Sequence, residues 1–240
     1  MKARLDRVLV DRGLVESRER AQALVMAGEV LVEGRKAAKP GQAVEAGSRI
    51  EVLARPPYVS RGGYKLAAAL DHFQVPARGR VCLDVGSSTG GFTDVLLQRG
   101  AARVHSVDVG AGQLDWKLRQ DPRVIVHEGI NARYLSLDQI GERVSLAVCD
   151  VSFISVTLIL PALAALLEAG GEMIILVKPQ FEAGRGQVGK GGIVRDPEVQ
   201  RAACRRVEDA ARGLGFATAI MESPILGGEG NREFLLHARH

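Results

Sequence analysis

Between residues 81 and 238 the chain alternates short apolar runs with longer amphipathic stretches. Seven runs have the length and the branched apolar content of strands, at residues 81–85, 103–108, 123–127, 144–149, 172–177, 216–221 and 233–238. Helical patterns lie between most of them, and strands that alternate with helices predict a doubly wound α/β sheet. Residues 224–231, between the last two runs, are few and lack a helical pattern. We therefore expect a hairpin there and an antiparallel final strand.

The first part of the chain follows a different pattern. Apolar positions at helical spacing predict one short helix ending at Gly13 and a second opening at Ser17. Strands at 30–32 and 50–53 follow, with glycines at the turns. Two adjacent prolines then stiffen the chain. We expect three parts: a small α+β domain at 1–54, a linker at 55–59 and the α/β domain at 60–240.

One predicted strand runs directly into a turn of small residues and then into a helix, over residues 81–92. Glycine and serine let a backbone approach a ligand closely, and a helix start offers free N–H groups. In open α/β sheets, ligands bind at such turns. The spacing D-x-G-x-x-x-G-G differs from the dinucleotide pattern G-x-G-x-x-G and indicates S-adenosylmethionine. The predicted cofactor-binding residues of this turn are Asp84, Gly86, Ser87, Ser88, Thr89, Gly90, Gly91 and Phe92.

A second acid fits the same cofactor. The next strand ends in Asp108, where a carboxylate can accept hydrogen bonds from both ribose hydroxyls. Asn131 follows the third strand, where related cofactor sites contact the adenine. An ordinary strand–helix turn with a surface acid is the alternative. Residues 184–191 share the spacing of a phosphate loop, but Gly191 replaces the magnesium-binding Ser or Thr, so ATP hydrolysis is not expected.

Positive charge is concentrated near the start of the chain. The formal net charge is +4, and residues 1–60 carry 11 of the Lys and Arg residues against 8 Asp and Glu. Clustered positive charge favours a nucleic-acid partner, although a solvated charged face would have the same composition. The candidate RNA-binding residues are Arg4, Arg7, Arg18, Arg20, Arg35 and Lys36.

The cysteines and the hydropathy of the chain indicate in which cellular compartment the protein resides. Cys82, Cys149 and Cys204 lack C-x-x-C spacing and matching His residues, which predicts buried reduced thiols and no metal site. The N-terminus is charged and has no apolar signal core, which predicts a cytoplasmic protein. Residues 151–167 are uncharged and approach the length of a membrane span, but Pro161 interrupts them. We expect a strand end, a loop and a buried helix there, and no membrane association.

Four charged residues lie where a parallel sheet would bring strand ends together. Asp150 and Lys178 end neighbouring strands, Glu233 begins the last strand, and Lys65 precedes the first. Charged residues beside long apolar runs are partly buried and therefore paired. Each of the four could alone be a strand-end salt bridge.

Residues 2–53 are similar to the RNA-binding module named after the small-subunit ribosomal protein S-four. The similarity is carried by Arg4-Leu5-Asp6, Gly13-Leu14-Val15, Ser17-Arg18, Ala21 and the run 28–34. It implies that the N-terminal domain binds RNA.

Almost the whole chain resembles the TlyA family, also labelled hemolysin A, which joins an S-four module to an FtsJ-like RNA 2′-O-methyltransferase domain. The segments that carry the resemblance are 60–66, 84–94, 150–153, 177–182 and 230–234. It implies a Rossmann-like class I methyltransferase sheet, S-adenosylmethionine as cofactor, and a cytidine ribose of ribosomal RNA in one or both subunits as substrate. It also implies that Lys65, Asp150, Lys178 and Glu233 form the catalytic Lys-Asp-Lys-Glu set of that class.

The chemistry of a ribose hydroxyl suggests a role for each member of the set. A lysine can accept the hydroxyl proton only when it is neutral. We assign Lys178 as the base, Lys65 as the cation that tunes or orients it, and Asp150 and Glu233 as the groups that fix the lysines and the hydroxyl. A non-catalytic RNA or ribosome-assembly binder and a membrane-active hemolysin are the competing functions. Both a monomer and a homodimer fit the sequence.

Overall fold

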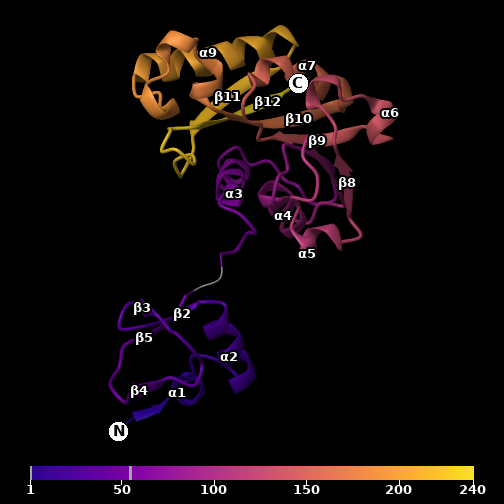
Figure 1. Cartoon of the computed structure of the whole chain (residues 1–240). Helices are drawn as coiled ribbons and strands as arrows, with labels where there is room; N and C mark the ends of the chain where they lie inside the picture. The colour runs from indigo at the N-terminus through magenta and orange to yellow at the C-terminus, as the bar shows by residue number, and fades with distance from the viewer. Residues whose placement is uncertain (1, 54–55) are drawn as a thin grey trace. The chain divides into compact units, whose positions relative to one another are not determined.

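The computed structural model describes residues 2–53 and 56–240, and the chain divides into two compact units, Met1–Pro57 and Tyr58–His240 (Figure 1). Part of the predicted linker 55–59, residue 55, lies outside the described residues, as do residues 1 and 54 of the predicted first domain. Tyr58 and Val59 belong to the second unit, where the Val59 N–H donates to Asp94 Oδ2 at 2.9 Å.

The first unit is a small α+β fold. Its elements are β1 (Lys2–Arg4), α1 (Leu5–Asp11), α2 (Arg18–Met26), β2 (Val30–Val32), β3 (Arg35–Lys36), β4 (Ala43–Glu45) and β5 (Ile50–Val52). Strand β2 pairs antiparallel with β3 and β5, and β1 pairs with β4. Both predicted helices and both predicted strands are present. The β1–β4 pair was not predicted, because every residue of β1 is exposed and gives no alternating apolar pattern.

The second unit is built on a seven-stranded sheet with the order β11-β12-β10-β9-β6-β7-β8. Its strands are β6 (Val81–Val85), β7 (Arg103–Asp108), β8 (Val124–Glu128), β9 (Val144–Cys149), β10 (Leu167–Val177), β11 (Ala217–Glu222) and β12 (Phe234–Arg239). Strands β6 to β10 run parallel, whereas β12 is antiparallel to both of its neighbours. The Rossmann-like sheet with an antiparallel final strand is therefore confirmed.

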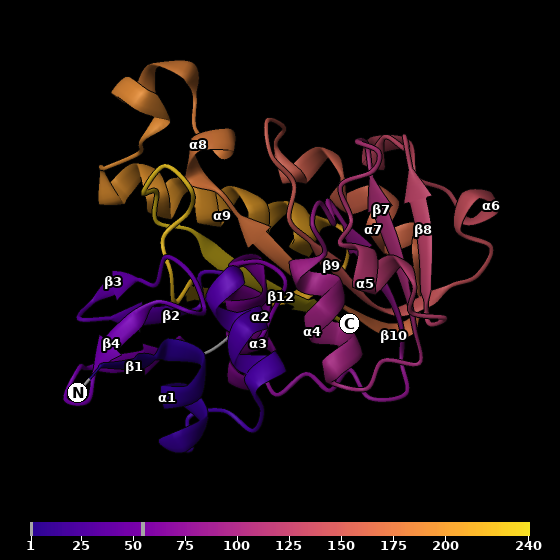
Figure 2. The same ribbon diagram turned by 60° about the horizontal axis from the view of Figure 1, so that its bottom comes forward.

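Helices cover both faces of this sheet (Figure 1). They are α3 (Gly62–His72), α4 (Gly91–Gln98), α5 (Trp116–Arg119), α6 (Leu137–Ile140), α7 (Leu160–Leu166), α8 (Pro179–Glu182) and α9 (Pro197–Gly213), with short 3-10 turns η1 (Ala132–Tyr134), η2 (Val156–Leu158), η3 (Arg185–Gln187) and η4 (Lys190–Gly192). Helices α3, α4 and α5 pack on one face, and α7 and α9 on the other. Figure 2 shows α8 at the carboxyl end of β10.

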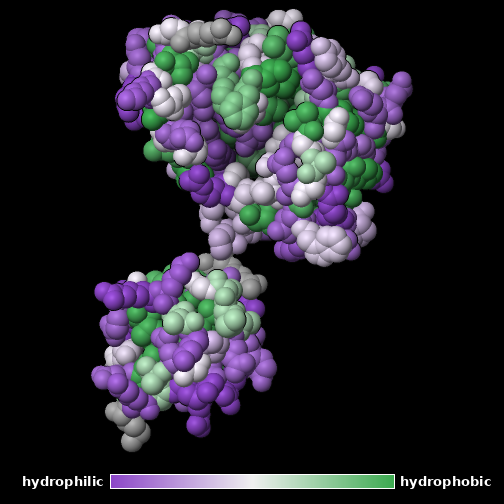
Figure 3. All heavy atoms as spheres, in the orientation of Figure 1, coloured by the Kyte–Doolittle hydropathy of each residue, from purple (hydrophilic) through white to green (hydrophobic). Residues whose placement is uncertain are grey.

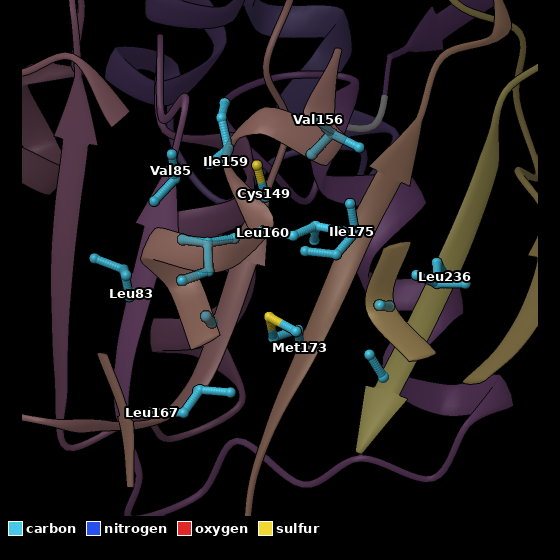
Figure 4. Packing of buried hydrophobic residues seen from close by; sticks show 14 of the residues in the cluster. Leu83, Val85, Cys149, Val156, Ile159, Leu160, Leu167, Met173, Ile175 and Leu236 are labelled. Carbon is cyan, nitrogen blue, oxygen red and sulfur yellow. The ribbon is translucent and has the colours of Figure 1, made fainter. Parts of the chain in front are cut away.

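Side chains along the central strands alternate between the two faces of the sheet and so contribute to a buried core on each face. Leu83 and Val85 of β6 point to the α7 side, where Leu160, Met173 and Leu236 complete a buried cluster (Figure 4). Neighbouring positions such as Cys82 belong to the cluster on the opposite face. A strand with apolar side chains on both faces is typical of a parallel sheet covered by helices on each side.

The uncharged stretch 151–167 is a loop followed by the short helix α7, whose Leu160, Leu163 and Leu166 are buried in the core. Within the described residues, no helix has the length and apolarity needed to cross a membrane. The three cysteines are buried and free, as predicted. Strand β10 begins five residues before the predicted start, because Leu167 makes a first pairing with Val144 before the register shifts to Glu172.

Candidate active site

The turn between β6 and α4 leaves no room for side chains at its glycines. Gly86 has a φ of +80°, and a Cβ there would lie 2.3 Å from the backbone oxygen of Asp150. A Cβ on Gly91 would lie 2.1 Å from Oγ of Ser60. Close backbone approach of this kind is a use of glycine at ligand sites. Glycine at both positions lets the turn lie directly against the segments that face it.

Two adjoining cavities open beside this turn, and we call them together the cofactor cleft. The first, of about 260 Å³, is lined by Ser60–Gly62, Lys65, Gly86–Thr89, Gly91, Phe92, Asp150, Ile225 and Leu226. The second, of about 440 Å³, is lined by Asp108, Gln113, Asn131, Ile154 and Ile159, among others. Both are lined by Gly86, Ser88 and Asp150. Figure 3 shows the second unit hollowed near its middle.

Asp108 lies at the end of β7 and holds two turns of backbone. Its Oδ2 accepts a hydrogen bond from the Ser88 N–H at 2.8 Å, and its Oδ1 accepts one from Gly110 at 2.7 Å. Each carboxylate oxygen has a further lone pair. Asp108 therefore fixes the glycine turn and lines the larger cavity of the cleft.

Asn131 precedes the 3-10 turn η1, and its Oδ1 accepts a hydrogen bond from the Arg133 N–H. It lines the larger cavity together with Ile130 and Ala132. This segment gives the cavity the apolar wall that a flat ring requires.

Asp84 lies beneath the glycine turn rather than in the cleft wall. It is fully buried, and its Oδ2 accepts a hydrogen bond from the Thr93 hydroxyl at 2.6 Å. Oδ1 is buried and has no hydrogen-bond partner among the described residues. Burial, with the charges of Asp150 and Asp108 adding to it, raises the pKa of Asp84 to about 7. Gly90 also lies outside the residues that line the cleft.

The cleft carries charges of both signs. Asp108 and Asp150 line it, and so do Arg61 and Lys65. S-adenosylmethionine also has both signs, since its carboxylate can lie near the cations and its sulfonium and ammonium groups near the carboxylates. The residues present therefore suit S-adenosylmethionine.

Two ion pairs lie beside the cleft. Lys65 Nζ lies 2.5 Å from Glu233 Oε2, and Lys178 Nζ lies 2.6 Å from Asp150 Oδ1. The Lys178–Asp150 contact lacks hydrogen-bond alignment, since Asp150 Oδ1 has no hydrogen bond, and Lys178 instead donates to Ser152 Oγ at 2.8 Å. The structure thus brings all four predicted catalytic residues into two pairs.

The sheet topology explains how these pairs meet. Val177 of β10 pairs with Phe234 of β12. The residues just beyond this pair, Lys178 after β10 and Glu233 before β12, therefore face each other at the edge of the sheet. Inserting β12 beside β10 is what gives this juxtaposition.

A third cavity, of about 520 Å³, shares Ser152 and Phe153 with the larger cavity of the cleft, and we call it the acceptor cavity. Its lining includes Ser152, Phe153, Lys178, Gln180, Phe181, Gly191, Gly192, Asn231 and Glu233. Each ion pair therefore has one member in the cofactor cleft, Lys65 or Asp150, and one in the acceptor cavity, Glu233 or Lys178.

Several lining residues were not predicted as site residues. Phe153 is 92% exposed, has a φ of +67°, and its ring centroid lies 5.3 Å from that of Phe181. A large exposed aromatic residue in the left-handed region is uncommon in a structural loop. Phe153 lies in segment 150–153, which carries the family resemblance, but an aromatic residue three positions after a strand-end acid is too common a pattern to mark it as a site residue.

The predicted RNA-binding residues divide by environment. Arg4 and Arg18 form ion pairs with the buried Asp6 at 2.9 and 3.2 Å, and these contacts hold the pKa of Asp6 well below its usual range. Arg7, Arg35 and Lys36 are exposed, and Arg20 is half-buried. The exposed side chains remain candidates for contacts with phosphates.

Metal chemistry was not expected at this site. Across residues 2–53 and 56–240, no three His, Cys, Asp or Glu side chains are grouped as metal ligands.

Comparison with known proteins gives the same fold and chemistry. The FtsJ-like methyltransferase family matches residues 58–240, and the S4 domain matches residues 3–50. The 16S/23S rRNA (cytidine-2′-O)-methyltransferase TlyA of Mycobacterium tuberculosis is 47% identical over 99% of this chain and 90% of its own length. Hemolysin A of Brachyspira hyodysenteriae is 41% identical over 98% of each chain.

A solved structure of a hemolysin-like protein from Streptococcus thermophilus superposes with a TM-score of 0.75 at 46% identity, covering 99% of this chain and 88% of that one. These matches confirm the expected resemblance and the expected S-adenosylmethionine-dependent methyltransferase fold. With its cofactor cleft, its paired charged residues and matches that span both units, the chain belongs to the TlyA/hemolysin A family, with an S4 domain followed by an FtsJ-like methyltransferase domain.

Proposed function

We propose that this protein methylates the 2′-hydroxyl of a cytidine in ribosomal RNA, in one or both ribosomal subunits. The observation that carries the proposal is the placement of the two ion pairs between the cofactor cleft and the acceptor cavity. That placement suits transfer of a group from one cavity to a nucleophile in the other. The M. tuberculosis relative, whose name specifies 16S/23S rRNA and the cytidine 2′-oxygen, supports the substrate.

The cofactor residues have separate tasks in this proposal. Among the residues that line the cleft, the backbone of Gly86–Thr89 would hold the amino-acid end of S-adenosylmethionine, Asp108 would accept from its ribose, and Asn131 would contact its adenine. The cofactor supplies an electrophilic methyl group on a sulfonium. Asp84 supports the turn from below through its hydrogen bond from Thr93.

The paired residues position the nucleophile and receive its proton. In its neutral form, Lys178 Nζ would accept the proton of the ribose 2′-hydroxyl as that oxygen takes the methyl group that S-adenosylmethionine would supply, and the cofactor would leave as a neutral thioether. Asp150 and Ser152 hold Lys178 in place from one side. Glu233 orients the hydroxyl and holds Lys65. Most of the rate gain comes from in-line positioning.

The first unit contributes RNA affinity. Arg7, Arg35 and Lys36 are exposed on it and can contact phosphates without a sequence preference. Ribosomal subunits as substrate place the reaction in the cytoplasm. A non-catalytic binder would have no use for two lysine–carboxylate pairs between the two cavities.

The test is transfer of radiolabelled methyl from S-adenosylmethionine to separated small and large ribosomal subunits that lack the modification, followed by nucleoside analysis. Wild type should yield 2′-O-methylcytidine. Lys178→Ala should abolish transfer while cofactor binding persists, and Lys117→Ala, at an exposed lysine of α5, should change nothing. No transfer to either subunit with cofactor bound would reject the proposed substrate, and near-normal turnover by Lys178→Ala would reject the assigned base.

A further inference from the structure

A groove on the second unit adjoins both the cofactor cleft and the acceptor cavity, and we call it the flanking groove. Its volume is about 570 Å³, and it is lined by Arg61 and Tyr64 at the start of α3 and by residues 225–228 and 230 between β11 and β12. Arg61 and residues 225 and 226 also line the smaller cavity of the cofactor cleft, and Gly228 also lines the acceptor cavity. A strand that enters the acceptor cavity can therefore continue into this groove.

The start of helix α3 serves the groove and the active site together. Arg61 directly precedes the helix and Tyr64 lies three positions later, so the two are neighbours on one side of its first turn. The next residue, Lys65, forms the ion pair with Glu233. Tyr64 lines the flanking groove, but it lines neither the cofactor cleft nor the acceptor cavity. An aromatic ring thus lies one residue away from a proposed catalytic lysine, in a separate hollow.

The ring of Tyr64 is held in place and remains accessible. Its centroid lies 5.5 Å from that of Tyr58, with the two ring planes at 83°. Edge-to-face packing of this kind favours one orientation of the rings. Tyr64 is nevertheless 39% exposed. A fixed, exposed aromatic ring in a groove is suited to stacking with a flat ligand.

The opposite wall of the groove is largely bare backbone. A Cβ on Gly227 would lie 2.3 Å from Glu233 Oε1, so this wall lies directly against the Lys65–Glu233 pair. A Cβ on Gly228 would meet no atom within 4 Å, and Gly228 is not in the left-handed region. Neither packing nor backbone conformation therefore requires glycine at 228. Gly228 is the residue that the groove and the acceptor cavity share, and without a side chain it narrows neither.

We propose that the flanking groove binds the nucleotide next to the target cytidine, with the base of that nucleotide stacked on Tyr64. This inference rests on the proposed function. Consecutive nucleotides are joined through one phosphate, so a strand whose ribose is held at Lys178 and Glu233 has a neighbour beside the acceptor cavity.

The chemistry of the lining favours an RNA strand. Arg61 is exposed and is the one charged residue among those that line the groove, so the groove attracts an anionic chain. The ring of Tyr64 and the apolar side chains of Ile225 and Leu226 suit the face of a base. Stacking tolerates any base, because every base has a flat face. The groove should therefore hold the neighbouring nucleotide without selecting its identity.

The first test is a crosslink from position 64 in the full-length protein. Tyr64→4-azidophenylalanine keeps the ring, and the variant is irradiated with the ribosomal subunit that accepts methyl. We expect a crosslink to the nucleotide directly before or after the methylated cytidine, mapped by primer extension. The same replacement at Trp116, which is 72% exposed and lines none of the three hollows, should give no crosslink at these positions. Crosslinks from position 64 only to distant RNA or to a ribosomal protein, or none, overturn the inference.

The second test separates stacking from folding. Tyr64→Leu removes the ring, Tyr64→Phe keeps it, and Trp116→Leu is the matched control. We expect Tyr64→Leu to raise KM for the subunit about tenfold, the effect of one lost stacking contact. Cofactor affinity should change by less than about threefold, because Tyr64 does not line the cofactor cleft. Tyr64→Phe and Trp116→Leu should resemble wild type.

Two kinetic outcomes would contradict the stacking role: a wild-type KM in Tyr64→Leu, or an equal rise in Tyr64→Phe. Thermal unfolding is measured for every variant. If Tyr64→Leu does not fold, the crosslink map decides.

Failure of the inference is distinct from failure of the proposed function. If wild type methylates neither subunit, the proposed substrate is wrong and the inference falls with it. If wild type methylates a subunit while position 64 crosslinks only elsewhere, the substrate stands and the flanking groove does not hold the neighbouring nucleotide.

Discussion

Lys65 and Glu233 meet at 2.5 Å across the active site although 168 residues separate them in the chain. Lys65 comes from α3, ahead of the sheet, and Glu233 directly precedes the last strand. Their side chains are only 10% and 3% exposed. A buried ion pair is costly to break, because removing one partner leaves the other charge uncompensated.

Glu233→Gln should therefore affect both stability and turnover. The variant leaves the Lys65 ammonium without its carboxylate, and we expect a loss of about 3–5 kcal/mol in the free energy of unfolding. We also expect kcat to fall at least about a hundredfold, as for removal of a positioned group in the transition state. Denaturant titration and methyl-transfer kinetics measure the two effects.

Glu198→Gln is the matched control, because Glu198 forms an exposed ion pair with Arg201 on α9. Such pairs contribute about 0–1 kcal/mol. Equal behaviour of the two variants would show that burial of the Lys65–Glu233 pair has no energetic role.

The strand pattern of the second unit could be predicted because the central strands are apolar on both faces and are bounded by clear turns. Strand β6 matches its prediction at both ends, and β12 lies within one residue of its own. Strand β1 could not be predicted, because it is short, exposed and polar and its pairing with β4 depends on tertiary contacts.

The site shows the same division between local and long-range information. Asp150, Lys178 and Glu233 were predictable because each lies at a strand end, where sheet topology determines the neighbours. The sequence did not indicate which lysine pairs with which carboxylate. Phe153 was missed as a site residue although it lies in segment 150–153, because its significance comes from its exposure and its left-handed backbone, which local sequence does not give.

Asp84 should make the stability of the cofactor-free protein depend on pH. Its folded pKa, about 7, lies above the ordinary value of 3.8. Between these values the unfolded chain releases a proton that the folded protein keeps, so stability falls as pH rises from about 4 to 7 and then levels off. The full difference is about 4 kcal/mol. Urea titrations at pH 5 and pH 8 measure the part of this difference that lies above pH 5, about 3 kcal/mol.

Asp84→Asn tests the cause. Its amide oxygen can still accept from Thr93, whereas no charge develops. Relative to wild type, the variant should gain stability on going from pH 5 to pH 8. A wild-type stability that rises over this interval, with Asp84→Asn following it in parallel, would show that Asp84 is ionised throughout.

Glu182 ties the loop after β9 to helix α8. Its two carboxylate oxygens accept from the Ser155 hydroxyl at 2.5 Å and the Val156 N–H at 2.7 Å, and burial raises its pKa. We expect Glu182→Ala to free the loop that carries Ser152 and Phe153 and to lower kcat about tenfold or more, since small displacements of positioned groups are costly. The same loop lines the larger cavity of the cofactor cleft through residues 150–154, so cofactor affinity, measured by calorimetry, should fall as well.

Glu182→Gln keeps one acceptor and should restore part of the activity, which a general loss of folding would not allow. Glu168→Ala, at an exposed glutamate of β10, should behave as wild type. If Glu182→Ala kept both the cofactor affinity and the kcat of wild type, the loop would not be the element it holds.

Asn231 joins two segments that border the acceptor cavity. Its buried side chain bonds the Val194 N–H and the Gly192 oxygen, and its own backbone oxygen accepts from Gly227. Asn231→Ala leaves the two backbone groups of the 192–194 segment unpaired, so the free energy of unfolding should fall by about 1–3 kcal/mol.

The KM values of Asn231→Ala should distinguish an effect on RNA binding from an effect on cofactor binding. Gly191 and Gly192 line the acceptor cavity and not the cofactor cleft, so Asn231→Ala should raise KM for the ribosomal subunit while KM for S-adenosylmethionine stays near that of wild type. Gln120→Ala, at an exposed amide, should leave both values unchanged. Because Asn231 lies two residues before Glu233, a fall in kcat with both KM values unaltered would instead show that its role is to hold Glu233 in place.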